Sequence, residues 1–73
     1  MTEPLIVIAR DLRPTKVCLS GARAFLARHG HDWDAFVKRG IPAEDLLATG
    51  DAIASRVVDA ARARVAAERR EAE

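Results

Sequence analysis

One short apolar run near the N-terminus constrains the fold of this chain more than any other feature. The run Leu5-Ile6-Val7-Ile8-Ala9 is rich in β-branched side chains and follows Pro4, which is typical of a buried strand. Buried backbone N–H and C=O groups need hydrogen-bond partners. No later segment looks like a second strand, so we expect this strand to pair with a strand from another chain. The alternative is an irregular arm that packs against helices of the same chain.

The rest of the chain has the apolar spacing and the terminal signals of helices. Proline suits a first helical turn, aspartate suits an N-cap, and glycine suits the left-handed residue that ends a helix. The Ser20-Gly21 pair leaves open a later start for the first helix. We expect helices over residues 14–29, over 33–39 after the Asp32 cap, over a very short segment that begins at Pro42 and ends before Gly50, and from the Asp51 cap to residue 68 or beyond.

The predicted fold is therefore mainly α: a small bundle of three to four helices with a short N-terminal β-arm. Residues 1–73 form a single domain, in which 1–13 are the arm, 14–65 the helical core and 66–73 an exposed C-terminal helix end. A domain of 73 residues buries only about 60% of its unfolded surface. Cys18 is the single cysteine, so no disulfide can form within the chain. A partner chain is the remaining source of support.

No residue pattern predicts catalysis or a metal site, and we expect neither an enzyme nor a cofactor. Asp32 and Asp34 are explained as a helix cap and a first-turn acid. Cys18 and His29 share a helical face but lie about 16 Å apart along the helix, which is too far to share one ion. His29, His31 and Asp32 lie close together in the sequence, as metal ligands can. His29 is better explained as a residue that suits a helix C-terminus.

Binding of nucleic acid is disfavoured by charge. A helix–glycine–helix pattern surrounds Gly30, but the second helix would present Asp32, Trp33 and Asp34 to the phosphates of a major groove. The net charge of +1 is also far from a basic footprint. Trp33 is either a partly buried core residue or a surface anchor for a partner protein.

The chain begins Met1-Thr2-Glu3-Pro4, without a basic lead, and its apolar run is too short for a signal peptide. No stretch approaches the roughly 20 apolar residues of a membrane span. We therefore expect a cytoplasmic protein in the producing cell.

The segment from Gly21 to Val58 resembles small proteins encoded by tailed bacteriophages and prophages. The resemblance covers about half of the chain, and it implies a phage setting, in which many small proteins are virion or assembly components. It assigns no functional residue, because the shared positions are caps, turns and core residues. These positions are Arg28-His29-Gly30, Asp32-Trp33, Phe36, Gly40-Ile41 and Leu47-Ala48-Thr49-Gly50-Asp51-Ala52.

The sequence thus predicts a small phage-derived structural or assembly protein that acts through protein–protein contacts in a multi-copy complex, as a virion component or a morphogenesis factor. Its expected partners are other protein chains, either copies of itself or phage structural proteins. Two alternatives stay open: a nucleic-acid-binding or regulatory helical module, and a phage inhibitor of a host protein. The residues expected to contact a partner are Leu5, Ile6, Val7, Ile8 and Trp33.

Overall fold

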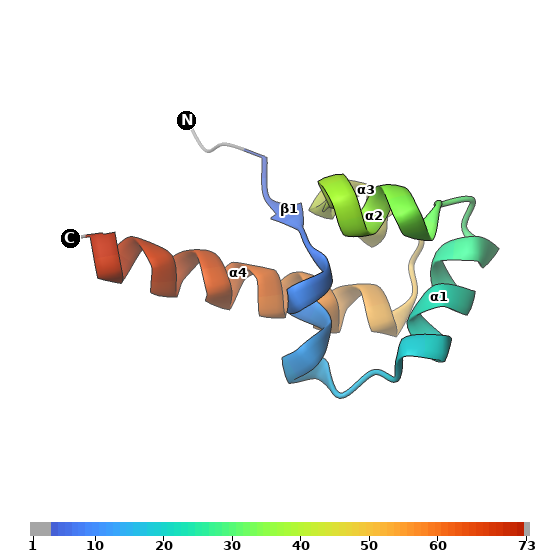
Figure 1. Cartoon of the computed structure of the whole chain (residues 1–73), viewed down its shortest axis with the longest axis horizontal. Helices are drawn as coiled ribbons and strands as arrows, with labels where there is room; N and C mark the ends of the chain where they lie inside the picture. The colour runs from blue at the N-terminus through green and yellow to red at the C-terminus, as the bar shows by residue number, and fades with distance from the viewer. Residues whose placement is uncertain (1–3, 73) are drawn as a thin grey trace.

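The computed structural model describes residues 4–72, which form five helical segments and a two-stranded sheet. The long helix α4 sets the 39 Å length of the molecule, since 21 helical residues span about 31 Å. The shorter elements gather around its N-terminal half, and its C-terminal half extends beyond them (Figure 1). In chain order the elements are β1 (Ile6–Val7), the 3₁₀ helix η1 (Ala9–Thr15), α1 (Leu19–Arg28), α2 (Trp33–Arg39), β2 (Ile41–Pro42), α3 (Ala43–Leu47) and α4 (Ala52–Ala72).

The N-terminal arm contains a strand, as predicted, although only Ile6 and Val7 of the apolar run form it. The expectation that this strand lacks a partner strand within the chain is wrong. β1 pairs with β2 in an antiparallel register in which Ile6 lies opposite Pro42 and Val7 opposite Ile41. The backbone N–H of Ala43 donates to the Leu5 carbonyl at 2.8 Å and continues the ladder. β2 escapes sequence analysis because it has two residues and one is a proline, which lacks the N–H of a strand residue. Pro42 fits because it occupies a position whose backbone groups point away from β1.

The sequence predicts one helix over residues 14–29, but the structure has two separate helical segments in this region. Residues 9–15 form η1, and α1 begins only at Leu19, close to the later start suggested by Ser20-Gly21. The Asp11 carboxylate accepts the Ile8 N–H at 2.9 Å and so starts η1 early. Lys16 has a left-handed backbone, with φ of 59°, and this ends η1 before α1 begins.

The later helix boundaries agree with the sequence signals. The Asp32 carboxylate accepts the Ala35 N–H at 3.1 Å and caps α2, which covers the predicted residues 33–39. Asp51 accepts the Ile53 N–H at 3.0 Å at the start of α4. Gly50 adopts a positive φ of 71° in the turn after α3, a conformation that glycine takes up readily after a helix. α4 continues to Ala72, beyond the expected minimum at residue 68.

One hydrophobic core joins the arm to the helices. Val7 and Val58 have no exposed surface, so β1 packs directly against α4. Phe25 and Phe36 are both core residues. Among residues 4–72, no helix is long and apolar enough to cross a membrane. The buried hydrophobic residues are Val7, Ala22, Phe25, Leu26, Phe36, Ile41, Ala43, Leu46, Ala54, Val57, Val58 and Ala61.

Candidate partner-binding surface

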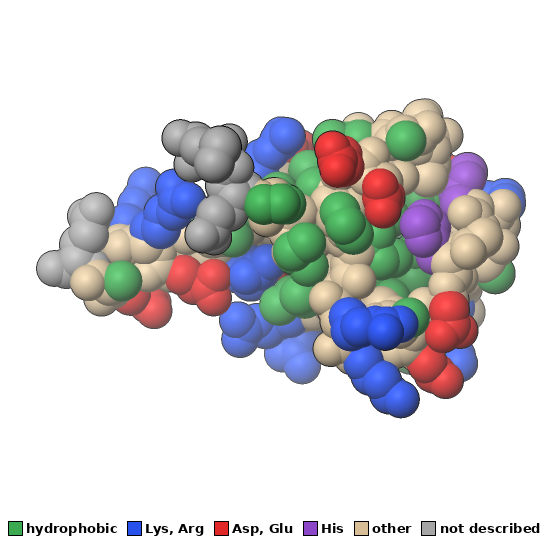
Figure 2. Space-filling view, turned by 90° about the horizontal axis from the view of Figure 1, so that it is seen from above, with side chains coloured by type: hydrophobic (Ala, Val, Ile, Leu, Met, Phe, Trp, Pro, Cys, Tyr) green, Lys and Arg blue, Asp and Glu red, His purple; other side chains and the backbone are tan. Residues whose placement is uncertain are grey.

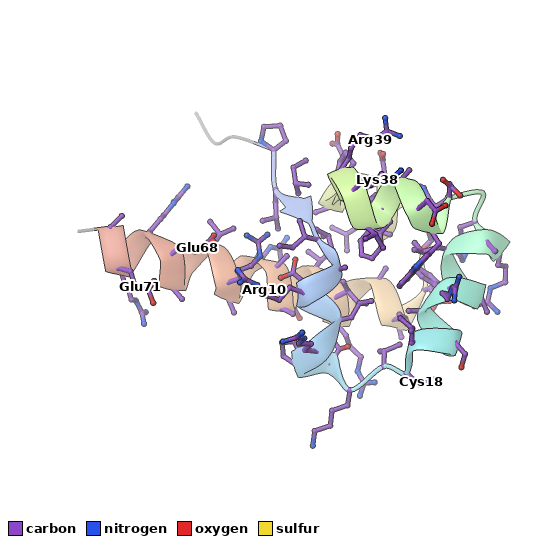
Figure 3. The ribbon with its side chains drawn as sticks, in the orientation of Figure 1. Arg10, Cys18, Lys38, Arg39, Glu68 and Glu71 are labelled. Atoms are coloured by element: carbon purple, nitrogen blue, oxygen red, sulfur yellow. The ribbon has the colours of Figure 1, made fainter. Side chains whose placement is uncertain are left out.

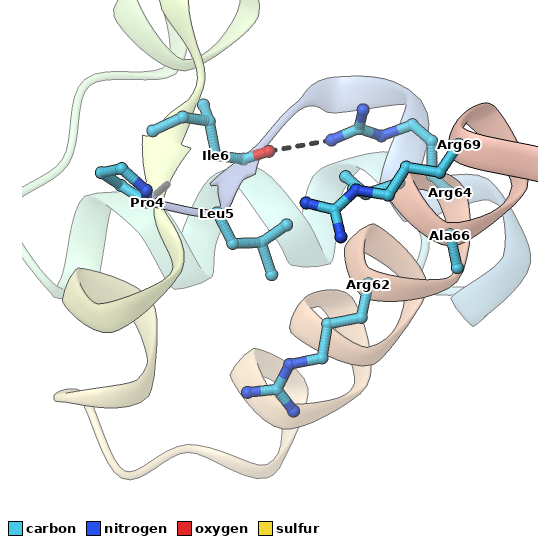
Figure 4. A pocket seen from close by; sticks show the side chains of 8 residues that line it. Pro4, Leu5, Ile6, Arg62, Arg64, Ala66 and Arg69 are labelled. Carbon is cyan, nitrogen blue, oxygen red and sulfur yellow. Dashed lines mark hydrogen bonds between the residues drawn. The ribbon is translucent and has the colours of Figure 1, made fainter. Parts of the chain in front are cut away.

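A buried ion pair fastens the N-terminal arm to α4. The guanidinium Nε of Arg64 donates to Asp11 Oδ1 at 2.9 Å, and the other carboxylate oxygen of Asp11 accepts the Ile8 N–H at 2.9 Å. The Nη2 of Arg64 donates to the Ile6 carbonyl, also at 2.9 Å (Figure 4). Asp11 is only 2% exposed. One arginine and one aspartate therefore hold β1, η1 and α4 in a fixed relation.

The surroundings of Arg64 stabilise the protonated form of its guanidinium group. Its pKa is raised above the usual arginine value, mainly by the hydrogen bond to Asp11, and the nearby Glu68 carboxylate, 3.0 Å from Nη1, adds to the effect. Sequence reasoning missed this pair because Asp11 and Arg64 are 53 residues apart and neither lies in a recognisable motif. The one local signal is an aspartate two residues after the apolar run, because aspartate is a common residue at helix starts.

The outer side of the arm borders an open groove on α4, which we call the arm groove. It has a volume of about 640 Å³ and is open to solvent. Figure 4 shows guanidinium groups of α4 on one side of it and the arm residues on the other. The lining residues of the arm groove are Pro4, Leu5, Ile6, Arg62, Arg64, Val65, Ala66 and Arg69.

A second open groove of about 420 Å³ continues from the arm groove toward α3. The two grooves share Pro4, Leu5 and Arg62, and the second one adds Leu47, a large hydrophobic residue that is 42% exposed. We call the two grooves together the arm face. Figure 2 shows hydrophobic side chains gathered at the middle of one side of the molecule, with Lys and Arg side chains around them.

The structure separates the predicted arm residues into an inner and an outer set. Val7 is completely buried in the core of its own chain, so the expectation that Val7 contacts a partner is wrong for this conformation. Side chains alternate between the two faces of a strand, which places Ile6 on the outside, where it is 36% exposed. Leu5 is half-buried and lines the arm groove, and Ile8 is half-buried beside Gly40.

Trp33, the remaining predicted contact, does not join the arm face. It lies at the start of α2, near α1, where its ring packs against Phe36 with the centroids 5.6 Å apart. The guanidinium carbon of Arg23 lies 5.4 Å from the Trp33 ring centroid, in the range of a cation–π contact. Trp33 is half-buried and packs on the hydrophobic core. These contacts give Trp33 a structural role on a different part of the surface.

The residues considered as metal ligands lie in ordinary structural positions. His29 ends α1 and meets the Phe25 ring edge-on, with the centroids 5.0 Å apart. Cys18 is exposed at the start of α1 (Figure 3), and its pKa is lowered, mainly by a hydrogen bond with the Ser20 hydroxyl. Within residues 4–72, no three His, Cys, Asp or Glu side chains gather closely enough to hold a metal ion.

Comparisons with protein-family models, with curated proteins and with solved structures find no match to this chain. The arm face is therefore the feature of this chain that bears most directly on its function.

Proposed function

We propose that this chain is a small structural or assembly protein that contacts other protein chains in a multi-copy complex of a tailed phage. The resemblance of the segment from Gly21 to Val58 to small phage proteins suggests this setting. The arm face supports the mode of action, because it presents an apolar surface that residues 4–72 leave exposed.

The physical basis of the proposal differs from the one that the sequence suggested. The backbone of β1 is bonded within the chain, so it does not require a strand from a neighbour. What carries the proposal is the exposure of Ile6 and Leu47 on one continuous, grooved face. Exposed apolar surface bordered by charged groups is typical of protein-interaction sites.

The sizes of the voids and grooves also favour binding of a protein at the surface over binding of a small molecule in the interior. A small void between core side chains measures about 10 Å³, which is at the lower limit for one water molecule. The larger grooves, including the arm groove, lie open to solvent. Small-molecule sites usually bury most of their ligand in a concave pocket. An open, partly apolar face suits a protein segment better than a small substrate.

Incorporation into purified virions tests the proposal. We expect mass spectrometry to detect the chain at a fixed ratio to the major capsid protein. The Ile6→Lys/Leu47→Lys variant, checked by circular dichroism for an unchanged fold, should be lost from the particles. The matched control is Leu19→Lys, since Leu19 is 58% exposed at the start of α1, away from β1 (Figure 1). Absence of the wild-type chain from virions and from assembly intermediates would refute the assembly role.

A further inference from the structure

We propose that the arm groove binds an extended segment of a partner protein in which two acidic side chains flank apolar ones. The acidic side chains would pair with Arg62 and Arg69, and the apolar ones would pack on Leu5 and Val65. The inference rests on the proposed function, because it names the partner chemistry of the same surface.

The charged side chains of the arm groove favour an anionic ligand. Of the described residues that line it, three are arginines and none is acidic. Arg64 is committed to Asp11, Glu68 and the Ile6 carbonyl. Arg62 and Arg69 are exposed, and the ion pair that Arg62 makes within residues 4–72, a 3.6 Å contact with Asp59, is open to solvent and easily exchanged. Two arginines are thus available to carboxylates of a ligand.

The spacing of these arginines suits an extended peptide. Arg62 and Arg69 lie seven residues apart on α4, which corresponds to about 10 Å along the helix axis. Side chains alternate between the two faces of an extended chain, so residues four positions apart share a face and lie about 13 Å apart. Because long arginine side chains adapt their direction, both can reach acids that flank three residues, the middle one of which lies on the same face as the acids. The Leu5 and Val65 side chains offer the apolar surface between them.

The backbone of β1 adds a polar group on the same side. The Leu5 carbonyl is bonded toward β2, whereas the Ile6 carbonyl accepts from Arg64 of α4. In an antiparallel strand the N–H and C=O of one residue point to the same side. The Ile6 N–H is therefore directed toward the arm groove, where an extended segment could accept it in the manner of an added strand.

A protein segment fits this groove better than a nucleic acid does. Acidic residues surround the groove: Glu44 lines the adjoining part of the arm face, and Asp59 and Glu68 lie beside the arginines on α4. A continuous row of phosphates would meet these carboxylates. Two carboxylates set apart by apolar residues need only the guanidinium groups of Arg62 and Arg69.

A blocked fluorescent peptide in which two glutamates flank the apolar segment Leu-Val-Leu tests the inference by anisotropy titration at two salt concentrations. We expect saturable binding that weakens about five-fold or more with Arg62→Gln or Arg69→Gln, and similarly when both peptide glutamates become glutamine. The matched control is Arg70→Gln, because Arg70 is an exposed arginine of the same helix that does not line the groove. All variants must keep the helical circular dichroism of the wild type.

Equal binding of the glutamate and glutamine peptides, or an equal loss with Arg70→Gln, would overturn the inference. So would tighter binding of a single-stranded oligonucleotide that depends on the same two arginines, which would indicate a nucleic-acid surface. Failure of the peptide to bind while the chain still enters virions refutes only the acidic ligand. Peptide binding by a chain that never enters particles refutes the assembly role and supports the ligand chemistry.

Discussion

Removal of the Asp11 side chain is predicted to destabilise the fold more than any surface change. In Asp11→Ala, the guanidinium of Arg64 stays mostly buried, with its side chain 18% exposed, but loses its main partner. The Ile8 N–H loses its acceptor at the same time. Breaking a buried ion pair by deleting one partner costs about 3–5 kcal/mol. Partial exposure of Arg64 places the expected cost near the lower end, at about 3 kcal/mol.

The assay is urea and thermal unfolding followed by far-UV circular dichroism. For a domain of this size, 1 kcal/mol shifts the melting temperature by about 4–8 °C, so the expected decrease is about 12–24 °C. A double-mutant cycle with Arg64→Ala isolates the pair, and we expect a coupling energy of about 1–3 kcal/mol. The control is Arg62→Ala, whose exposed ion pair with Asp59 should contribute at most about 0.5 kcal/mol. If the two single changes add within about 0.5 kcal/mol, the pair does not hold the arm and the reasoning fails.

Three further predictions follow from local geometry. Gly40→Ala should lower the free energy of unfolding in urea by at least about 2 kcal/mol more than Gly30→Ala. Both glycines have positive φ, but a β-carbon at Gly40 would lie 2.6 Å from the backbone of the arm, whereas a β-carbon at Gly30 would meet no atom within 4 Å. Equal costs would contradict the close approach. Ser20→Ala should move the pH midpoint of Cys18 alkylation by iodoacetamide upward, because the hydroxyl lowers the thiol pKa and the thiolate is the reactive form; an unchanged midpoint would contradict this. A chain that ends after Glu68 should melt within about 4 °C of the full chain, since residues 66–72 are exposed; a larger decrease would show that the helix end supports the fold.

Features of the fold that depend on single residues could be predicted from the sequence. The Asp32 cap defines the start of α2, and Asp51 accepts a backbone N–H at the start of α4. Gly40 and Gly50 take up the positive φ values expected where a helix ends. Each of these signals acts within a few residues, so no knowledge of the tertiary structure is needed to recognise it.

Features that depend on distant residues could not be predicted. The partner strand of β1 has two residues and includes Pro42, and it becomes a strand only because the arm lies beside it. Asp11 starts η1 and is buried because Arg64, at the other end of the chain, reaches it. Sequence alone placed the candidate site on the arm, but it could not separate the buried Val7 from the exposed Ile6 or bring Arg62 and Arg69 to the same surface.

The exposed arm face exists only if β1 is bonded within its own chain, and amide hydrogen exchange tests this most directly. The N–H of Ala43 donates to the Leu5 carbonyl, so its exchange reports on the pairing of the arm. We predict that NMR-detected exchange of the Ala43 amide is equally slow at low micromolar and at millimolar protein concentration. Protection that disappears on dilution would show that the arm pairs between chains, and it would contradict the account.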